Sequence, residues 1–365
     1  MTLRVLAFTP LPAAGAAGRY RVFQYVEPLR AHGITLEAVP FFDDAAFARL
    51  YTPGGALAKA WDIARLTRAH AARLRSAAHH DVAFVHRELW PLAGGWPLEL
   101  LRAAQPRYVF DLDDAVFLPN VSDANRRFVN LKSHGSVSAI AAHAGAVTAG
   151  NGWLAEWARA TRGTSASANT VEVLPTVVDC DLWRPASAPS GDAIRLLWIG
   201  SPSTVRYLQT WSAVITRLGA RHPELELHVI GARLELPGVR CVSHAWGADT
   251  ERTLAQHCHI GLSPLDTGDW ESGKCGLKQL LYMSLGLPAV ASRTGVHTEI
   301  VTPGVDGELV DDDAGLEAAL ERLIVDRARR EALGGGARAT VEQRYSLRSA
   351  TPRLAALLHR VAESR

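Results

Sequence analysis

The sequence predicts an α/β protein made of two domains, in which short apolar strands alternate with longer amphipathic helices. This alternation runs through the first 150 residues and begins again with an apolar run at 194–199. Between the two halves lies the stretch 185–192, PASAPSGD, which has hardly any bulky side chain and is typical of a linker. A length of 365 residues allows each domain to bury its own core.

The composition is typical of a soluble globular protein. Hydrophobic residues make up 48% and charged residues 21% of the chain, and the formal net charge of +2 gives no electrostatic reason to expect nucleic acid as a partner. The apolar run at the N-terminus is too short for a signal peptide, and no run approaches the roughly 18 apolar residues of a membrane-spanning helix. We therefore expect a cytoplasmic protein. Its four cysteines show no paired spacing, so no disulfide framework is expected.

The chain opens with a strand, a flexible loop and a helix, the beginning of a Rossmann-like βα unit. The strand covers 3–9, the loop is rich in glycine and alanine, and the helix ends near Gly33. Val22, Tyr25, Val26 and Leu29 are predicted to face the core. The loop lacks the Gly-x-Gly-x-x-Gly pattern that a dinucleotide requires, which argues against a NAD-dependent oxidoreductase.

Two arginines follow this loop at the start of the helix, where the helix dipole disfavours positive charge. Arg19 and Arg21 either take part in a binding site or are ordinary surface charges.

Three carboxylates follow the strand at 108–111, as Asp111-Leu-Asp113-Asp114. Ligands bind at this end of the strands in open parallel sheets, so Asp113 and Asp114 are interpreted as ligand-binding groups. An Asp-x-Asp pair can also hold a divalent cation, but we predict no metal. A third interpretation is structural, with Asp111 capping a helix or pairing with Arg126 or Arg127.

The stretch 264–292 is predicted to form a polar loop, a helix at 276–285 and a buried strand. Gly286 and Pro288 mark the end of the helix. Helical spacing divides its side chains into an inward face and an outward one. The predicted inward residues are Leu277, Leu280, Leu281 and Ser284, and the outward ones are Lys278, Gln279 and Tyr282.

The start of this helix carries unusual charges. The chain has only four lysines, and two of them, Lys274 and Lys278, lie at the helix N-terminus. Cations there are disfavoured by about 0.3–1 kcal/mol each, which suggests that an anion binds nearby. Lys274 and the free backbone N–H groups of Cys275, Gly276 and Leu277 would suit a diphosphate. The alternative is a surface helix with two stray lysines.

The pattern from Glu271 to Gln279, ESGKCGLKQ, resembles the nucleotide-sugar site of retaining glycosyltransferases of family 4, which have the GT-B fold. The resemblance implies two Rossmann-like α/β domains that face each other across a cleft. It places Glu271 near the donor sugar. It also puts Gln279 where the family has a second glutamate that binds the ribose, and an amide binds a ribose without a charge-assisted hydrogen bond.

The resemblance extends to the other site residues. Arg206 is the only cation in the first turn of a helix predicted at 205–218, near the point where many relatives hold the diphosphate. The expected catalytic residues are Glu271, Lys274 and Arg206. The expected donor-binding residues are Ser201, Ser203, Gly273, Cys275, Gly276, Leu277 and Gln279, and those on the acceptor side are Gly18, Arg19, Arg21, Asp113 and Asp114.

The domain limits expected from these observations are 1–184 for the acceptor domain, 185–192 for the linker and 193–345 for the nucleotide-sugar domain. A last helix at 346–365, after a break at the glycines of 334–336, is expected to cross back to the first domain. The expected reaction transfers a sugar from a nucleoside-diphosphate sugar to a glycan, a lipid-linked or a small-molecule acceptor, with retention, without a metal and without a cofactor. A GT-B protein that binds nucleotide sugars without catalysis is the alternative, and peripheral association with the inner membrane face stays open.

Overall fold

A computed structural model describes residues 2–50, 52, 54–92, 94–119, 134–163, 170–186 and 191–364. The chain divides into two compact units. The first contains residues 1–176, 273–275 and 350–365, and the second contains residues 177–272 and 276–349. Four residues of the expected linker, 187–190, lie outside the described part of the chain, as do Arg126 and Arg127.

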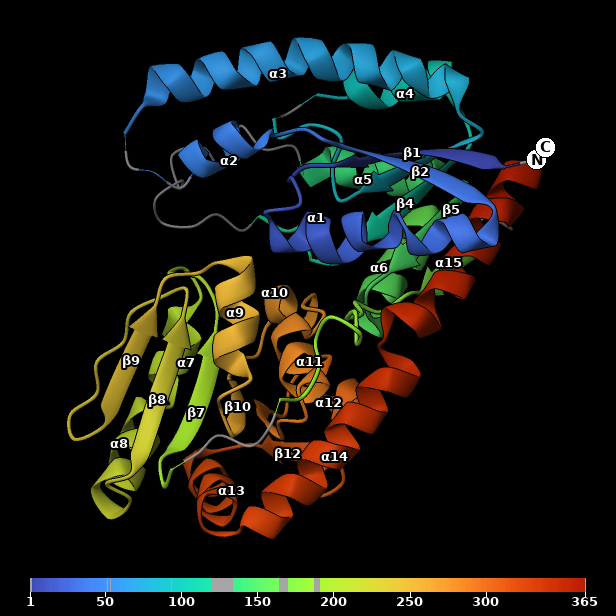
Figure 1. Cartoon of the computed structure of the whole chain (residues 1–365). Coiled ribbons are helices and arrows are strands. Elements are labelled where there is room, and N and C mark those ends of the chain that lie inside the picture. The colour runs from blue at the N-terminus through green and yellow to red at the C-terminus, as the bar shows by residue number, and fades with distance from the viewer. Residues whose placement is uncertain are drawn as a thin grey trace. The chain divides into compact units, whose positions relative to one another are not determined.

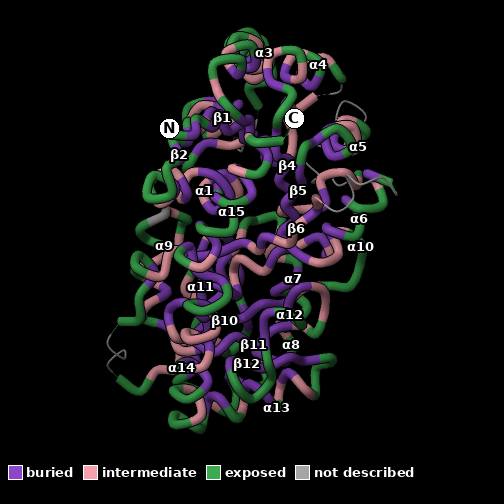
Figure 2. Tube along the Cα trace, turned by 90° about the vertical axis from the view of Figure 1, so that its right-hand side faces the viewer, coloured by how far each residue is buried: buried purple, intermediate pink, exposed green. Residues whose placement is uncertain are grey.

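The first unit is built on a six-stranded sheet in which every neighbouring pair is parallel (Figure 1). The strand order is β2-β1-β3-β4-β5-β6. The strands span Leu3–Thr9 (β1), Ile34–Pro40 (β2), Val82–His86 (β3), Tyr108–Leu112 (β4), Ala146–Ala149 (β5) and Val171–Val173 (β6). Nearly all of β1 and the whole of β3 are buried, as are β4 and β5 (Figure 2), which agrees with the continuous apolar runs in their sequences.

Helices cover this sheet. They are Ala16–Arg21 (α1), Asp44–Leu50 (α2), Ala56–Ser76 (α3), Trp96–Ala104 (α4), His134–His143 (α5) and Gly152–Arg162 (α6). The prediction of a single helix after the glycine-rich loop is wrong. The short helix α1 is followed by two 3₁₀ turns, at Phe23–Tyr25 and Pro28–His32. The backbone leaves helical geometry at Val22, and Pro28 has no N–H to continue a helix. Tyr25 and Leu29 still point into the core, whereas Val26 is half-buried.

The last helix, Leu347–Glu363 (α15), contributes its residues from Ala350 onward to the first unit. Arg353 donates a 2.6 Å hydrogen bond to the carbonyl oxygen of Val173 at the end of β6. His359 Nε2 lies 3.2 Å from the carbonyl oxygen of His32. These contacts attach α15 to elements far away in the sequence.

The second unit repeats the same architecture. Its six strands are all parallel, in the order β12-β11-β10-β7-β8-β9. They span Ile194–Ile199 (β7), Leu225–Ile230 (β8), Arg240–His244 (β9), Ile260–Ser263 (β10), Ala289–Ser292 (β11) and Gly307–Val310 (β12). A large apolar cluster that includes the fully buried Trp198, Leu218 and Leu320 joins these strands to the helices on one face.

The helices of the second unit are Val205–Thr210 (α7), Ser212–Arg221 (α8), Ala248–Ala255 (α9), Asp269–Ser272 (α10), Leu277–Ser284 (α11), His297–Ile300 (α12), Asp313–Val325 (α13) and Arg327–Arg344 (α14). The single helix expected at 205–218 is two helices that meet at Trp211. None of the helices in the described ranges is both long enough and apolar enough to cross a membrane.

The predicted two-sided pattern of the helix after the glycine-lysine stretch is wrong. Gln279 and Tyr282, expected to point outward, are completely buried, while Leu277 is only half-buried. The ring of Tyr282 lies directly against Gly261 of β10, and the tyrosine hydroxyl accepts a 2.9 Å hydrogen bond from the N–H of Ile199. Helix α11 is thus enclosed on several sides, so its sequence period does not separate buried from exposed residues.

The prediction of a helix break at 334–336 is also wrong, because α14 continues through all three glycines. A Cβ atom on Gly334 would lie 2.1 Å from the carbonyl oxygen of Gly286. A Cβ on Gly336 would lie 2.1 Å from the carbonyl oxygen of Val305. A Cβ on Gly335 would meet nothing within 4 Å. Two of the glycines therefore serve close packing and do not interrupt the helix.

This difference gives a prediction with its own control. Gly334→Ala and Gly336→Ala should each lower the free energy of unfolding by about 1–3 kcal/mol, because backbone atoms must move to admit the methyl group. Gly335→Ala should raise it by up to about 1 kcal/mol, since alanine is the better helix former. Chemical denaturation of the three variants measures these changes. Similar effects at all three positions would contradict the packing described here.

Candidate functional site

Each sheet has one point at which the strand order reverses: the chain first adds strands to one side of its first strand and then continues on the other side of that strand. In the first sheet this point lies between β1 and β3, and in the second between β7 and β10. Open parallel sheets bind ligands outside the carboxyl ends of the strands at such a point, because the loops there lead away in opposite directions. Each unit has a polar cluster at this place.

In the first unit, a buried hydrogen-bonded chain connects the ends of three strands. Thr9 Oγ1 at the end of β1 lies 2.9 Å from His86 Nδ1 at the end of β3. His86 Nε2 lies 3.0 Å from Asp113 Oδ1, just after β4. Thr9 and His86 were not among the residues expected from the sequence, although Thr9 ends the strand predicted at 3–9. The chain fixes the carboxylate of Asp113 at the carboxyl edge of the sheet.

Arg87 holds the same carboxylate from its other side. Its backbone has a φ of +64°, which makes it the one non-glycine residue with positive φ in the described part of the chain. Its Nε lies 2.5 Å from Asp113 Oδ1, and its terminal nitrogen lies 3.1 Å from Oδ2. Burial tends to raise the pKa of Asp113, but Arg87 and His86 outweigh burial and hold the pKa well below its usual range. Asp113 is therefore a fixed negative charge.

Lys274 belongs to the first unit, where it pairs with Asp114. Its Nζ lies 3.0 and 3.1 Å from the two carboxylate oxygens of Asp114. Asn151, which caps α6, donates a 2.9 Å hydrogen bond to the backbone carbonyl of Lys274. The structure thus brings together Asp113, Asp114 and Lys274.

The residues on either side of Lys274 are tightly packed within the same unit. A Cβ atom on Gly273 would lie 2.6 Å from the Cβ of Ala115. The Sγ of Cys275 would lie 2.3 Å from a Cβ on Gly150. Cys275 is buried, and burial raises the pKa of its thiol.

Arg21 and Asp111 form a buried ion pair, which the sequence did not predict. Arg21 Nε lies 3.0 Å from Asp111 Oδ2, and the side chains are 1% and 0% exposed. Arg21 also donates to the carbonyl oxygen of Leu174, and Thr148 donates to Asp111. Arg21 is thus neither a surface charge nor open to a ligand. Among the described residues, Asp111 caps no helix, because its carboxylate is bound by Arg21 and Thr148.

The other residues near the glycine-rich loop lie differently. Arg19 is half-buried, and its guanidinium stacks 5.2 Å from the centre of the Tyr20 ring. Gly18 is buried, and a Cβ on it would lie 2.5 Å from the carbonyl oxygen of Leu11. Gly18 therefore serves the packing of the loop against itself.

The three aspartates do not converge on one point, since Asp111 faces Arg21 while Asp113 faces His86 and Arg87. In the described ranges, no group of three histidine, cysteine or acidic side chains is arranged to hold a metal ion.

In the second unit, a second chain of hydrogen bonds leads to Glu271. Arg206 donates to the hydroxyl oxygen of Tyr207 over 2.9 Å, and that hydroxyl donates to Glu271 Oε1 over 2.6 Å. Arg206 itself lies 3.7 Å from Glu271 and is 61% exposed, whereas Glu271 is buried. Burial, followed by the bond to Glu271, raises the pKa of Tyr207 to about 12. The structure therefore groups Glu271 with Arg206 through a tyrosine that the sequence analysis missed.

The loop after β7 gathers hydroxyl groups next to a lysine. Ser201 Oγ lies 2.8 Å from Ser203 Oγ, and the Ser201 N–H donates to Thr204 Oγ1 over 3.1 Å. Lys278 of α11 places its Nζ 3.5 Å from the same Thr204 oxygen. The same Nζ lies 4.3 Å from the centre of the Trp198 ring. Ser201 and Ser203 are thus together, as expected, while Lys278 and Thr204 were not among the expected site residues.

Gly276 and Gln279 occupy the start of α11. Gly276 caps the helix with a φ of +67°, and a Cβ there would lie 2.5 Å from Ile300. The side chain of Gln279 is fully buried, and neither of its amide atoms has a hydrogen-bond partner among the described residues. Gln279 is thus enclosed in the helix packing rather than exposed at its surface.

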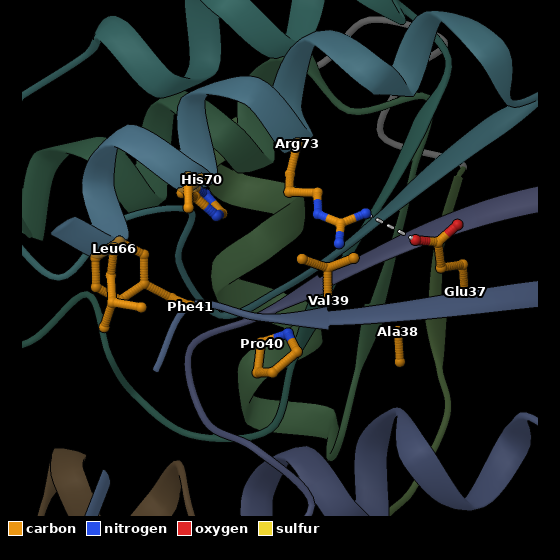
Figure 3. Close-up of a pocket in the computed structure, with 9 residues that line it drawn as sticks. Glu37, Ala38, Val39, Pro40, Phe41, Leu66, His70 and Arg73 are labelled. Atoms are coloured by element: carbon orange, nitrogen blue, oxygen red, sulfur yellow. Dashed lines mark hydrogen bonds and ion pairs between the residues drawn. The ribbon is translucent and has the colours of Figure 1, made fainter. Parts of the chain in front are cut away.

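A separate hollow of about 220 Å³ lies between β2 and α3 in the first unit (Figure 3). Arg73 and Glu37 form a 3.2 Å hydrogen bond across one end, and the rings of Phe41 and His70 meet edge to face at the other. Burial lowers the pKa of His70 to about 4, so the ring is neutral at pH 7. None of the residues expected from the sequence lines this hollow.

The buried ion pair gives a prediction for two neighbouring arginines. Arg21→Met should lower the free energy of unfolding by about 3–5 kcal/mol, because it leaves Asp111 buried without its cation. Arg19→Met should cost less than about 1 kcal/mol, because Arg19 is half-buried and stacks on an aromatic ring. Urea denaturation at pH 7 compares the two. Equal losses would contradict the difference in burial.

A second prediction concerns Tyr207→Phe, which removes the hydrogen bond to buried Glu271. The free energy of unfolding should fall by about 1–3 kcal/mol at pH 7. Because the folded pKa of about 12 lies above the usual value of 10, the tyrosine contributes stability that is complete below pH 10 and lost as the pH rises to 12. Denaturation from pH 7 to 12 should therefore show the two proteins converging above pH 10. A constant difference across this range would count against the bond.

The chain was compared with known protein families, with proteins of curated function and with solved structures. Residues 193–326 match the family described as Glycosyl transferases group 1. No protein of curated function matches the chain.

Several solved structures have a similar fold. HepE of Anabaena, in complex with UDP and glucose, has a TM-score of 0.65 at 16% identity, over 98% of this chain and 99% of that one. A glycosyltransferase from Rickettsia africae has a TM-score of 0.70 at 11% identity, over 100% of both chains. Sucrose-phosphate synthase of Thermosynechococcus elongatus has a TM-score of 0.68 at 16% identity, over 99% of both. The predicted fold is thereby confirmed: the chain has the GT-B fold, and its residues 193–326 match the model of the glycosyl transferases group 1 family.

Proposed function

We propose that this protein is a retaining glycosyltransferase that moves a sugar from a nucleoside-diphosphate sugar to an acceptor. The observation that carries the proposal is the buried Glu271, oriented by Tyr207 and Arg206 beyond the carboxyl ends of the second sheet. A carboxylate fixed in this way can hold the hydroxyl groups of a sugar. The group 1 domain at 193–326 supports a glycosyltransferase, and HepE in complex with UDP and glucose supports a nucleotide sugar as donor.

In the proposed reaction, the bond between the anomeric carbon and the donor phosphate oxygen breaks, and both electrons pass to that oxygen. The acceptor oxygen bonds to the same face of the anomeric carbon, and its proton passes to the departing phosphate. Asp113 suits this scheme as a positioning group, because its low pKa makes it a poor base. Lys274 and Arg206 would stabilise the charge that develops on the diphosphate.

The remaining assignments are part of the same proposal. The donor contacts comprise Ser201, Ser203, Gly276, Leu277 and Gln279. The acceptor is a glycan, a lipid-linked or a small molecule that meets Asp113 and Asp114. The reaction needs no metal or cofactor, and the protein acts in the cytoplasm or at the inner face of the membrane.

Thermal unfolding with a panel of UDP, GDP, ADP, TDP and their sugars tests the donor. One nucleotide should stabilise the protein, by about 2.7 kcal/mol at a hundred times its Kd, and magnesium should not change the effect. The product formed with the matching sugar should keep the anomeric configuration of the donor, as NMR would show. Lys274→Ala should lower turnover at least about a hundredfold, since it removes a positive charge from the leaving group.

Two results would count against this proposal in different ways. Stabilisation by a nucleotide without any product, over a broad set of acceptors, would favour a GT-B protein that binds nucleotide sugars without catalysis. An inverted product would refute retention while leaving the donor assignment intact. Near-normal turnover in Lys274→Ala would remove that lysine from the catalytic set.

A further inference from the structure

Helix α3 carries the two most exposed large apolar side chains in the described part of the chain. Leu57 is 89% exposed and Trp61 is 71% exposed. They lie four positions apart, so they are neighbours on one face of the helix. Figure 1 shows α3 along the outside of the first unit, and much of the helix is exposed (Figure 2). Neighbouring large apolar side chains on an outer surface are typical of an interaction site.

Two arginines continue the same face of α3. Arg68 and Arg75 are exposed, and with 3.6 residues per turn they leave the helix within about 40° of the two apolar side chains. The buried residues of the helix lie on the other side, against the sheet. We call the four exposed residues Leu57, Trp61, Arg68 and Arg75 the outer stripe. It extends about 27 Å along the helix axis.

The outer stripe is cationic. Helix α3 has five lysine and arginine residues and a single acidic one, Asp62, which is buried. Two other arginines of the helix, Arg65 and Arg73, pair with acidic side chains of the same unit. Within the described ranges, neither Arg68 nor Arg75 forms an ion pair with an acidic side chain. The positive charge on the outer face is therefore not neutralised by the first unit.

An anionic lipid surface fits the outer stripe better than a second copy of the chain does. In a two-fold dimer the stripe would meet itself, and four arginines would be brought together around the apolar contact. A bilayer offers phosphate groups to the arginines and, just beneath them, an apolar boundary to the leucine and the indole ring. Tryptophan is enriched at this boundary because its ring is apolar with one polar group.

We propose that the outer stripe docks the first unit on an anionic lipid bilayer. Leu57 and Trp61 enter the boundary between headgroups and acyl chains, and the two arginines bind lipid phosphate groups. This inference does not depend on the donor site. It adds a partner to the proposed function, and it selects the membrane surface from the two locations named there.

Co-sedimentation of the full chain with lipid vesicles tests the inference. The vesicles consist of phosphatidylcholine alone or mixed with phosphatidylglycerol, which is anionic. The wild type should bind the mixed vesicles at least about tenfold more tightly than the neutral ones. Raising the salt concentration to about 0.5 M should weaken binding to the mixed vesicles, because it screens the arginines.

Two double variants separate the apolar and the charged contributions. Leu57→Ser with Trp61→Ser should weaken binding to the mixed vesicles at least about tenfold, because it removes the apolar contact. Arg68→Gln with Arg75→Gln should weaken it about 25-fold, since each cation near an anionic surface strengthens binding about fivefold. All four side chains are exposed, so the melting temperature of each variant should equal that of the wild type.

The second unit supplies matched controls. Leu182→Ser with Val325→Ser removes two exposed apolar side chains. Arg184→Gln with Arg348→Gln removes two exposed arginines, and so changes the net charge by the same amount. Both control variants should bind the mixed vesicles as the wild type does.

Fluorescence gives a second measurement that reports on insertion. Brominated phosphatidylcholine in the mixed vesicles quenches a tryptophan only when its ring reaches the acyl chains. The wild type, with its ten tryptophans, should be quenched, whereas Trp61→Phe should bind the vesicles and lose most of the quenching.

Several outcomes would overturn the inference. One is equal binding of the wild type to neutral and mixed vesicles, or binding to neither. Another is an equal loss of binding in the control variants, which would show a general charge effect. A dimer that Leu57→Ser with Trp61→Ser dissociates, without binding of the wild type to vesicles, would assign the stripe to a second copy. A wild type that binds mixed vesicles but no nucleotide would refute the proposed donor and leave this inference intact.

Discussion

The buried ion pair between Arg21 and Asp111 determines how the carboxyl edge of the first sheet is organised. It joins α1 to β4, and further hydrogen bonds to Thr148 and to the carbonyl oxygen of Leu174 extend it to β5 and to the chain beyond β6. A buried charge without a partner is very costly, so the loop after β1 must stay where Arg21 can reach the sheet. This pairing leaves Asp113 as the carboxylate that faces His86 and Arg87.

Tyr282 has a comparable role in the second unit. Its hydroxyl accepts the N–H of Ile199 at the end of β7, and its ring fills the space that Gly261 leaves over β10. β7 and β10 are the neighbouring strands between which the strand order of the sheet reverses. This one side chain therefore sets the position of α11 relative to that point. Lys278 lies one turn before Tyr282 on the same helix. Its approach to Trp198 therefore follows from the packing of the tyrosine.

The sequence was sufficient to predict the alternation of strands and helices, because continuous apolar runs are typical of strands buried in parallel sheets. It also singled out Glu271 and the serines after β7 as candidates, because they lie in local patterns, and their roles stay predictions. It failed wherever a partner comes from a distant segment. Arg21 and Asp111 are 90 positions apart, and Tyr207 and Glu271 are 64 apart. The burial of Gln279 and the continuity of α14 through Gly334 depend on neighbouring backbone that no local period reveals.

The composition of the first unit has a consequence for anyone who wishes to study it in isolation. A fragment that ends at Thr176 would lack the segment 273–275 and the end of α15, both of which belong to this unit. Ala115 and Gly150 would lose the atoms that pack on them, and Gly145 would lose its contact with Val361. Asp114 would lose the ammonium of Lys274. We expect such a fragment to expose apolar surface and to aggregate, so that cutting this chain at a single peptide bond does not release an intact folding unit.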